Sequence, residues 1–183
     1  GSIVKHNNQF YLYYCGWTRC TSVPYNWAIG LATSDDGSKF KKYSQGPIVG
    51  ASPNEPFLQA CPIVYKLSQN DWHMFYLSGI KWLEFNNKYE SQYLLFHATS
   101  KNGIDWERDS EPIIKTTVEN ECQTSASIIK NGDNFHMFFS YRFGQQFRED
   151  IKKGYRLGYA YSKDLKSWER DDSKISISIS QEG

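Results

Sequence analysis

Several features that would place this chain in a familiar class are missing from its 183 residues. No apolar run approaches the roughly 20 residues of a membrane-spanning helix, and no basic-then-apolar segment opens the chain, so no membrane partner is expected. Neither sign of charge is in excess, because 21 Lys and Arg accompany 20 Asp and Glu. Nucleic-acid binders usually carry a marked basic excess, so the sequence predicts no nucleic-acid partner.

Metal-binding and cofactor-binding signatures are absent as well. The four cysteines, Cys15, Cys20, Cys61 and Cys122, form no CxxC pair, so a structural zinc site is not expected. The sequence holds no glycine-rich phosphate loop and no Ser/His/Asp nucleophile motif, and we therefore predict no metal and no cofactor. Free thiols in a reducing cytosol are the simplest interpretation, which predicts a cytoplasmic protein. A bridge between Cys15 and Cys20 within one loop stays open.

Aromatic residues are what the chain has in abundance. Tyr, Phe and Trp number 13, 11 and 6 and make up 16% of the residues. Such residues favour β-strands, and they also line sugar-binding surfaces. No stretch shows a sustained 3.6-residue hydrophobic period with caps, so the sequence predicts an all-β fold with few helices.

One sequence unit occurs three times. Each copy has Ala-x-Ser, a polar turn, and an aromatic residue six positions after the serine. The serines and aromatics are Ser34 and Phe40, Ser100 and Trp106, and Ser162 and Trp168. Aromatic segments 10–14, 72–76 and 135–139 precede the copies, and apolar segments 2–5, 62–66 and 127–130 lie further upstream. Each unit therefore predicts four short antiparallel strands, with hairpin turns at the polar positions.

Four antiparallel strands repeated about every 60 residues are typical of propeller blades; a β-sandwich is the alternative. We predict a β-propeller with three blades in one segment, 1–183, with units of roughly 1–50, 51–115 and 116–175. Ile3, Ile63 and Ile128 should lie on equivalent innermost strands, and the three aromatics on equivalent outer strands. Residues 176–180 are expected to form a further strand or a connector.

Three blades are too few to close a propeller, which typically needs four to eight. The sequence therefore predicts that this chain is the central part of a larger, five-bladed propeller. Assembly from two chains is the alternative. An oligomer is expected if the chain is only part of a propeller.

The hairpins Ser34–Phe40 and Ser100–Trp106 resemble those of the five-bladed propeller glycoside hydrolases of families 43, 32, 62, 68 and 130. The third copy departs, with Leu165 where the others have Gly. Segments 13–19 and 140–142 are similar to uncharacterised family-43-like proteins of bacterial surface-polysaccharide gene clusters. The resemblance implies a glycosidase-like hydrolase that cleaves a glycan or glycoconjugate by carboxylate acid/base chemistry.

In the resembled families the active site lies at the end where each innermost strand begins. Glu55 and Glu121 each stand near such a start, and glycoside hydrolysis canonically needs two carboxylates. Glu121-Cys122 resembles the Glu-Cys acid motif of the invertase-like family, although Gln123 replaces the Pro that follows there. We therefore predict Glu121 as the acid and Glu55 as a second carboxylate. The family-43 Asp-Pro and Glu-Gly-Pro motifs are absent, and a loop carboxylate paired with Lys or Arg is the alternative role.

Aromatic and charged residues are expected to gather at the same end, in the loops between the second and third strands of each unit. Arg forks grip carboxylates or phosphates, and Trp faces stack on sugar rings. The predicted partner is therefore a carbohydrate, acidic or phosphorylated, bound by Trp17, Arg19, Arg142, Arg148, Asp150 and Arg156. Glu121 and Arg142 are expected to border one axial pocket.

Two other functions fit the same residues. A catalytically silent, lectin-like propeller needs stacking and hydrogen bonds but no pair of carboxylates, and a protein-interaction propeller is a third interpretation. His73 and His136 occupy one slot of the repeat. Because equivalent slots of different blades lie far apart, they are not expected to hold one ion.

Overall fold

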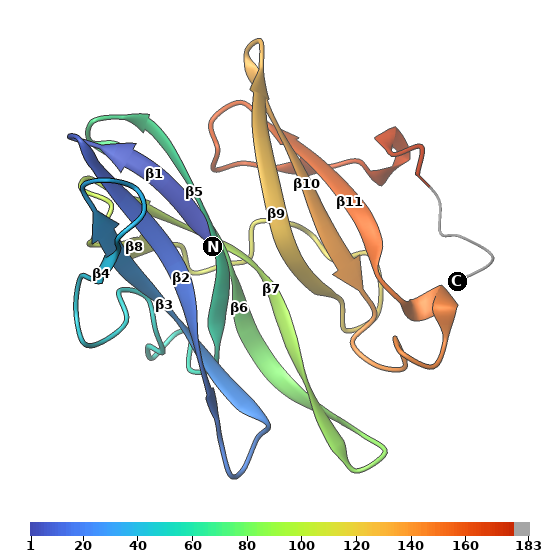
Figure 1. Cartoon of the computed structure of the whole chain (residues 1–183). Coiled ribbons are helices and arrows are strands. Elements are labelled where there is room, and N and C mark those ends of the chain that lie inside the picture. The colour runs from blue at the N-terminus through green and yellow to red at the C-terminus, as the bar shows by residue number, and fades with distance from the viewer. Residues whose placement is uncertain (178–183) are drawn as a thin grey trace.

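The chain folds as a row of β-sheets in the computed structural model, which describes residues 1–177 (Figure 1). Three four-stranded antiparallel sheets account for every strand of this range, so the predicted all-β fold with three such sheets is confirmed. Two short 3₁₀ turns, η1 (Ile151–Lys153) and η2 (Asp172–Lys174), are the helical elements among these residues. Residues 176 and 177 belong to no strand, and the rest of the predicted segment 176–180 lies outside the described residues.

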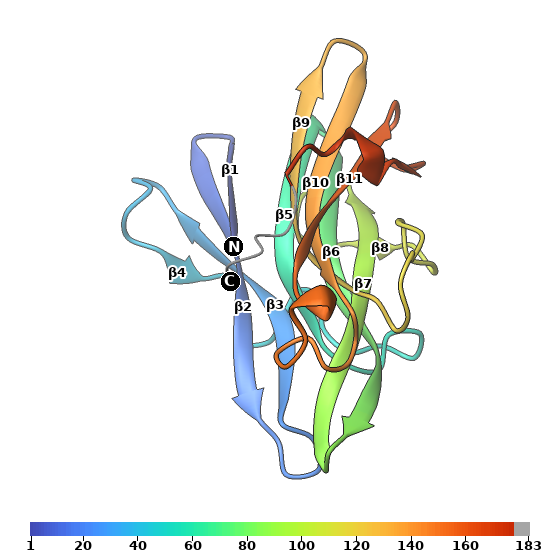
Figure 2. The same ribbon diagram turned by 90° about the vertical axis from the view of Figure 1, so that its right-hand side faces the viewer.

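Each sheet is built from strands that follow one another in the chain. Sheet 1 contains β1 (Ser2–His6), β2 (Gln9–Arg19), β3 (Tyr25–Ser34) and β4 (Lys41–Lys42). Sheet 2 contains β5 (Gln59–Ser68), β6 (Asp71–Phe85), β7 (Lys88–Ser100) and β8 (Glu107–Arg108). Sheet 3 contains β9 (Cys122–Asn131), β10 (Asn134–Arg142), β11 (Arg156–Ser162) and β12 (Glu169–Arg170). Figures 1 and 2 show sheet 2 standing between the other two, with one apolar core on each of its faces.

Strand pairing makes the three repeats equivalent. The last strands of the three sheets pair in the same register. Lys42, Arg108 and Arg170 lie opposite the alanines that recur in the repeat at positions 32, 98 and 160. The predicted outer aromatics come two positions before these residues and so occupy equivalent places, but each lies one residue before its outermost strand and not on it as predicted. These matches show that the similarity between the copies extends over whole sheets.

The first strands of the three sheets pair with their second strands in the same register, apart from a shift of one residue in sheet 2. Ile3 and Ile128 pair with equivalent residues of the second strands, and Val64, rather than Ile63, occupies that slot in sheet 2. The pairing is irregular between Lys66 and Ser68, which places one extra residue between the turn and the apolar run of β5. Ile3, Ile63 and Ile128 therefore lie on equivalent strands, as predicted, and only the register of Ile63 differs by one position, because a bulge changes register without changing composition.

The repeated Ser-x-Asp turn is held by local hydrogen bonds. The Ser34 hydroxyl oxygen accepts the backbone N–H groups of Asp36 and Gly37, and the Asp36 carboxylate accepts those of the next two residues. Gly37 and Gly103 have φ values of 74° and 73°, a left-handed conformation that suits glycine. Leu165 adopts the same conformation with φ 65°, and its side chain is fully buried in the core between sheets 2 and 3. Burial of this side chain offsets the backbone cost at the third turn.

The outward faces of sheets 1 and 3 lack a covering layer in the described structure. One slot of the second strand holds Tyr13, Phe75 and Phe138 in the three sheets, with exposed fractions of 0%, 0% and 40%. Ile3 on sheet 1 and Ile129 on sheet 3 are exposed by 55% and 61%. The difference follows from position, because the first two aromatics face a neighbouring sheet and Phe138 does not.

Candidate functional site

Three loops come together at one end of the sheets, which we call the loop end: β2–β3, β6–β7 and β10–β11. Tyr25 Oη and Ser91 Oγ lie 2.9 Å apart and join the first two loops. The hydroxyls of Tyr93 and Tyr155 lie 3.3 Å apart and join the second loop to the third. Burial raises the pKa of Tyr25 and of Tyr93, so both hydroxyls stay protonated at neutral pH. The connectors that lead into β5 and β9 reach the same end, as predicted for a shared site.

Aromatic rings line part of the loop end. Tyr25 and Trp27 stack with centroids 4.7 Å apart and planes 4° apart, and Trp82 meets Tyr25 edge-on at 5.2 Å. Trp17, predicted to stack on a sugar, lies opposite Trp27 in the strand pairing and is 62% exposed. Tyr25 and Trp27 were not among the predicted site residues, although two aromatics at alternate positions of a strand start were a usable signal. The loop end therefore presents aromatic surface from sheets 1 and 2.

Arg142 is an internal residue of the loop end and not a surface cation. It is 2% exposed, and its Nη1 donates to the carbonyls of Phe143 and Gly144 at 2.8 and 3.3 Å. Its guanidinium lies 3.6 Å from the centroid of Phe147 and 5.4 Å from that of Tyr93. Through these contacts the Arg142 guanidinium holds the β10–β11 loop against sheet 2. The same contacts leave the guanidinium little access to a ligand.

The other predicted binding residues of this loop are also engaged with the protein. Arg148 pairs with Glu90, and the Asp150 carboxylate caps η1 by accepting the Lys152 N–H at 2.9 Å. Arg156 Nη1 donates to the Gly154 carbonyl at 2.8 Å. Arg19, at the tip of β2, is exposed and forms no ion pair among residues 1–177. The exposed predicted residues without such contacts are therefore Trp17 and Arg19.

Glu121 is fully buried at the start of β9, with every lone pair directed at a donor. Its Oε1 accepts from Gln123 Nε2 and from Arg170 Nη1, each at 2.7 Å. Its Oε2 accepts the Thr117 and Val118 N–H groups at 2.8 and 3.2 Å. Glu121 and Arg142 do lie at the same end of sheet 3, since Arg142 pairs with Cys122, but the cation bound to Glu121 is Arg170.

Glu55 repeats this arrangement one unit earlier. Its carboxylate accepts the Tyr76 hydroxyl at 3.0 Å and lies 3.2 Å from Arg108 Nη1. Arg108 and Arg170 occupy the same position of the outermost strand, so each connector carboxylate is bound by the arginine of the sheet that it enters. This repeated contact favours a structural role for both glutamates, which is the alternative that the sequence left open.

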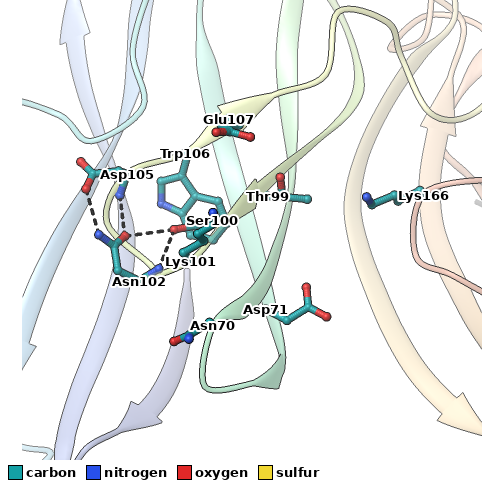
Figure 3. Close-up of a pocket in the computed structure, with 10 residues that line it drawn as sticks. All are labelled: Asn70, Asp71, Thr99, Ser100, Lys101, Asn102, Asp105, Trp106, Glu107 and Lys166. Atoms are coloured by element: carbon teal, nitrogen blue, oxygen red, sulfur yellow. Dashed lines mark hydrogen bonds between the residues drawn. The ribbon is translucent and has the colours of Figure 1, made fainter.

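A separate cavity of about 500 Å³ lies at the opposite end, between sheets 2 and 3 (Figure 3). Asp71 and Thr99 line it from sheet 2, and Lys166 reaches toward it from the β11–β12 loop. The buried imidazoles of His73 and His97 connect the carboxylates of Asp71 and Asp109 in a row of hydrogen bonds. His73 Nδ1 lies 2.8 Å from His97 Nε2. His73 Nε2 lies 3.1 Å from Asp71 Oδ1, and His97 Nδ1 lies 2.7 Å from Asp109 Oδ2. These histidines belong to one sheet, and His136 instead contacts Tyr159.

The number of protons on His73 and His97 limits how many hydrogen bonds this row of four side chains can form. Three links between acceptor-only carboxylates and two imidazoles need three N–H groups, but two neutral imidazoles supply two. One link therefore lacks its proton at neutral pH; the longest is that to half-exposed Asp71. Burial lowers the pKa of His73 and of His97; Lys166 adds to this, while Asp71, Asp109 and Asp164 oppose it.

We expect the free energy of unfolding to fall as the pH drops below 6.5. Because the folded-state pKa values are lowered, the unfolded chain binds more protons, and stability is lost from the unfolded pKa of about 6.5 down through the folded values. Each histidine contributes at most about 1.4 kcal/mol per pH unit. Urea unfolding at pH 7.5, 6.5 and 5.5 measures the slope, and His73→Gln/His97→Gln should flatten it. A slope unchanged in that double variant would contradict the assignment.

Residues 1–177 contain neither a membrane-spanning helix nor a metal-holding group of side chains. No helix in this range is both long and apolar enough to span a membrane. No group of three or more His, Cys, Asp or Glu side chains in it is arranged to hold a metal ion.

Comparison with known proteins begins with sequence. No family model matches the chain. Two uncharacterised proteins of Mycobacterium tuberculosis, from strains CDC 1551 and H37Rv, are each 27% identical to it over 181 residues. The aligned region covers 98% of this chain and 56% of each relative, so the chain spans about half the length of the curated relatives it matches.

Solved glycoside hydrolases share this fold, as the resemblance in sequence implies. A thermostable family-43 enzyme matches 96% of the chain with a TM-score of 0.66 at 17% identity. The family-32 β-fructofuranosidase of Bombyx mori matches 92% with a TM-score of 0.65 at 20% identity. A family-130 protein matches 93% with a TM-score of 0.67 at 18% identity. The chain covers 54%, 35% and 47% of these three structures, respectively.

Proposed function

We propose that the protein is a glycosidase-like hydrolase built on a β-propeller, and that the loop end of this segment binds the saccharide. The observation that carries the proposal is the shared fold, which extends over more than nine-tenths of the chain in glycoside hydrolases of three families. The exposed indole of Trp17 and the stacked pair Tyr25 and Trp27 supply the kind of surface on which sugar rings stack.

In this proposal the three sheets are blades of one segment of a five-bladed propeller. Two observations support it: both outward faces carry exposed apolar residues, and the curated relatives are nearly twice as long as this chain. A further blade on each side would cover Ile3 and Phe138 as sheet 2 covers Tyr13. The whole protein's reaction would then draw on residues from blades outside this segment.

The reacting carboxylates, in this proposal, are not Glu55 and Glu121. A general acid must present its proton to the glycosidic oxygen, and the Glu121 carboxylate is already surrounded by protein donors. We place the acid and the base on the remaining blades, whose loops would face the same axis. The segment described here would then hold and orient the sugar.

A lectin-like protein is the second candidate function, and one observation favours it. Both connector carboxylates are bound by arginines, so the described residues bring no free pair of carboxylates together at the loop end. Binding without hydrolysis needs no such pair. The two candidates therefore differ in turnover and agree on the binding surface.

We expect Trp17→Ala to weaken saccharide binding roughly two- to tenfold, the effect of losing about 0.5–1.5 kcal/mol of ring stacking. Binding of neutral, uronic-acid and phosphorylated oligosaccharides to the full-length protein would be measured by calorimetry, with released reducing ends measured in parallel. Tyr43→Ala is the matched control, because Tyr43 is 51% exposed but follows the outermost strand of sheet 1. Preference for the charged sugars would implicate exposed Arg19.

The outcomes separate the candidates. Binding with release of reducing ends supports the hydrolase, and binding without turnover supports the lectin-like protein. Absence of binding to every glycan class tested, or equal loss in the Trp17 and Tyr43 variants, would contradict both.

A further inference from the structure

Two cysteines from neighbouring sheets lie in contact near the loop end. The backbone N–H of Cys61 in β5 donates to Cys15 Sγ of β2 at 3.1 Å. Cys15 is exposed and Cys61 is partly exposed. Cys15 therefore lies beside a residue 46 positions away, and the bridge to Cys20 that the sequence left open is not the contact observed.

Backbone geometry does not demand a cysteine at position 61. Cys61 sits in a β-bulge with φ 51°, and Ser125 occupies the same place in β9 with φ 55°. The bulge is thus a feature of the repeat, and a serine serves it equally well. Packing does not explain Cys15 either, because an exposed thiol adds little to a core; Cys61, in contrast, packs against the apolar cluster that contains Leu58 and Leu77.

The surroundings make Cys61 a nucleophile. Interactions with the side chains of Cys15 and Thr124 outweigh burial and lower the pKa of Cys61 below its ordinary value. The interaction with the Cys61 side chain, together with burial, raises the pKa of Cys15. The lowered pKa favours the thiolate at Cys61 over that at Cys15, and thiolates are the species that attack disulfides.

We propose that Cys15 and Cys61 are a reversible redox pair that exchanges with low-molecular-weight disulfides of the glutathione type and ties sheet 1 to sheet 2. The Cys61 thiolate attacks one sulfur of the small disulfide, forms a mixed disulfide and expels one small thiolate. Cys15 then gives its proton to solvent and attacks Cys61 Sγ, and the second small thiolate leaves. Two protein thiols are oxidised to one disulfide, and one small disulfide is reduced to two thiols.

This bond would act on the proposed binding surface. Cys15 lies two residues from Trp17 on the same strand, and Cys61 belongs to the strand that begins at the loop end. A disulfide would hold the β2–β3 hairpin against sheet 2, whereas in the thiol form the two sheets meet through packing and hydrogen bonds. The chemistry depends on these two residues alone, so it stands or fails independently of carbohydrate binding.

The test uses the 183-residue chain in glutathione buffers of increasing oxidised fraction at pH 7.5, with acid quenching, alkylation and peptide mass spectrometry. We expect a Cys15–Cys61 disulfide in the wild-type chain and in the matched control Cys20→Ser. Cys15→Ser should trap a mixed disulfide on Cys61 in most molecules, and Cys61→Ser should abolish the internal bond. The internal bond should also revert when reduced glutathione is added in excess.

Two results would overturn the proposal. One is glutathione attached equally to Cys15, Cys20 and Cys61 with no internal bond. The other is a disulfide between Cys15 and Cys20.

Discussion

Glu121→Gln is expected to lower the free energy of unfolding by about 1.5–3 kcal/mol, the usual loss when hydrogen bonds to a buried charged group are removed. Glu121 is 0% exposed, and the side chain of Arg170 is 6% exposed, so the change removes one of the two carboxylates that bind a buried cation and leaves Asp172, 2.8 Å from Arg170 Nη2, as the other. The amide would also place an N–H₂ group against donors that now point at an oxygen. Urea unfolding followed by tryptophan fluorescence measures the loss.

Glu119→Gln is the matched control, because Glu119 is an exposed carboxylate of the same connector. It should change stability by less than about 0.5 kcal/mol. Arg170→Met should destabilise at least as strongly as Glu121→Gln, because it also removes the partner of Asp172, and the double variant should lose less than the sum, since buried Glu121 is then no longer left unpaired. A Glu121→Gln protein as stable as the control but without turnover would instead restore Glu121 as the acid.

Self-association of the isolated 183-residue chain is the second large effect that we expect. The outward face of sheet 3 exposes Phe138 and Ile129, although the residues in the Phe138 slot of the other sheets are fully buried. Large exposed apolar patches drive association, and the partner that fits this face is another sheet of the same repeat. Sedimentation velocity over a concentration series should show a rising sedimentation coefficient, or the chain should prove poorly soluble.

Ile129→Thr/Phe138→Thr should shift the chain toward monomer. Leu67→Thr is the control, since Leu67 is 42% exposed, slightly more than Phe138 at 40%, but lies on a sheet that is covered on both faces. A stable monomer at every concentration in the wild-type chain would show that the face needs no covering layer. A longer chain in which further sheets cover both faces should remain monomeric.

Local chemistry explains why the strands could be predicted from sequence. The Ser-x-Asp turns carry their own hydrogen bonds within a few residues, and the apolar and aromatic segments on either side alternate with strand period. Three copies of one pattern fixed the number of sheets. The register of Ile63 shows the limit, because the bulge near Lys66 shifts the pairing by one residue and leaves no mark in composition.

The site, in contrast, depended on contacts between distant residues. Arg170 lies 49 positions from Glu121, and its equivalent in the first repeat is Lys42, so the pairing rule that links connector glutamates to outer arginines is visible only in the folded sheets. From sequence, Arg142 was a plausible ligand-binding cation, but in the structure the β10–β11 loop covers it. The chain by itself determined which segments are strands and where they turn, because those interactions are short in sequence. Tertiary structure alone decided which charges are buried, which thiols meet and which aromatics stay exposed, because solvent access and charge pairing are properties of neighbours in space.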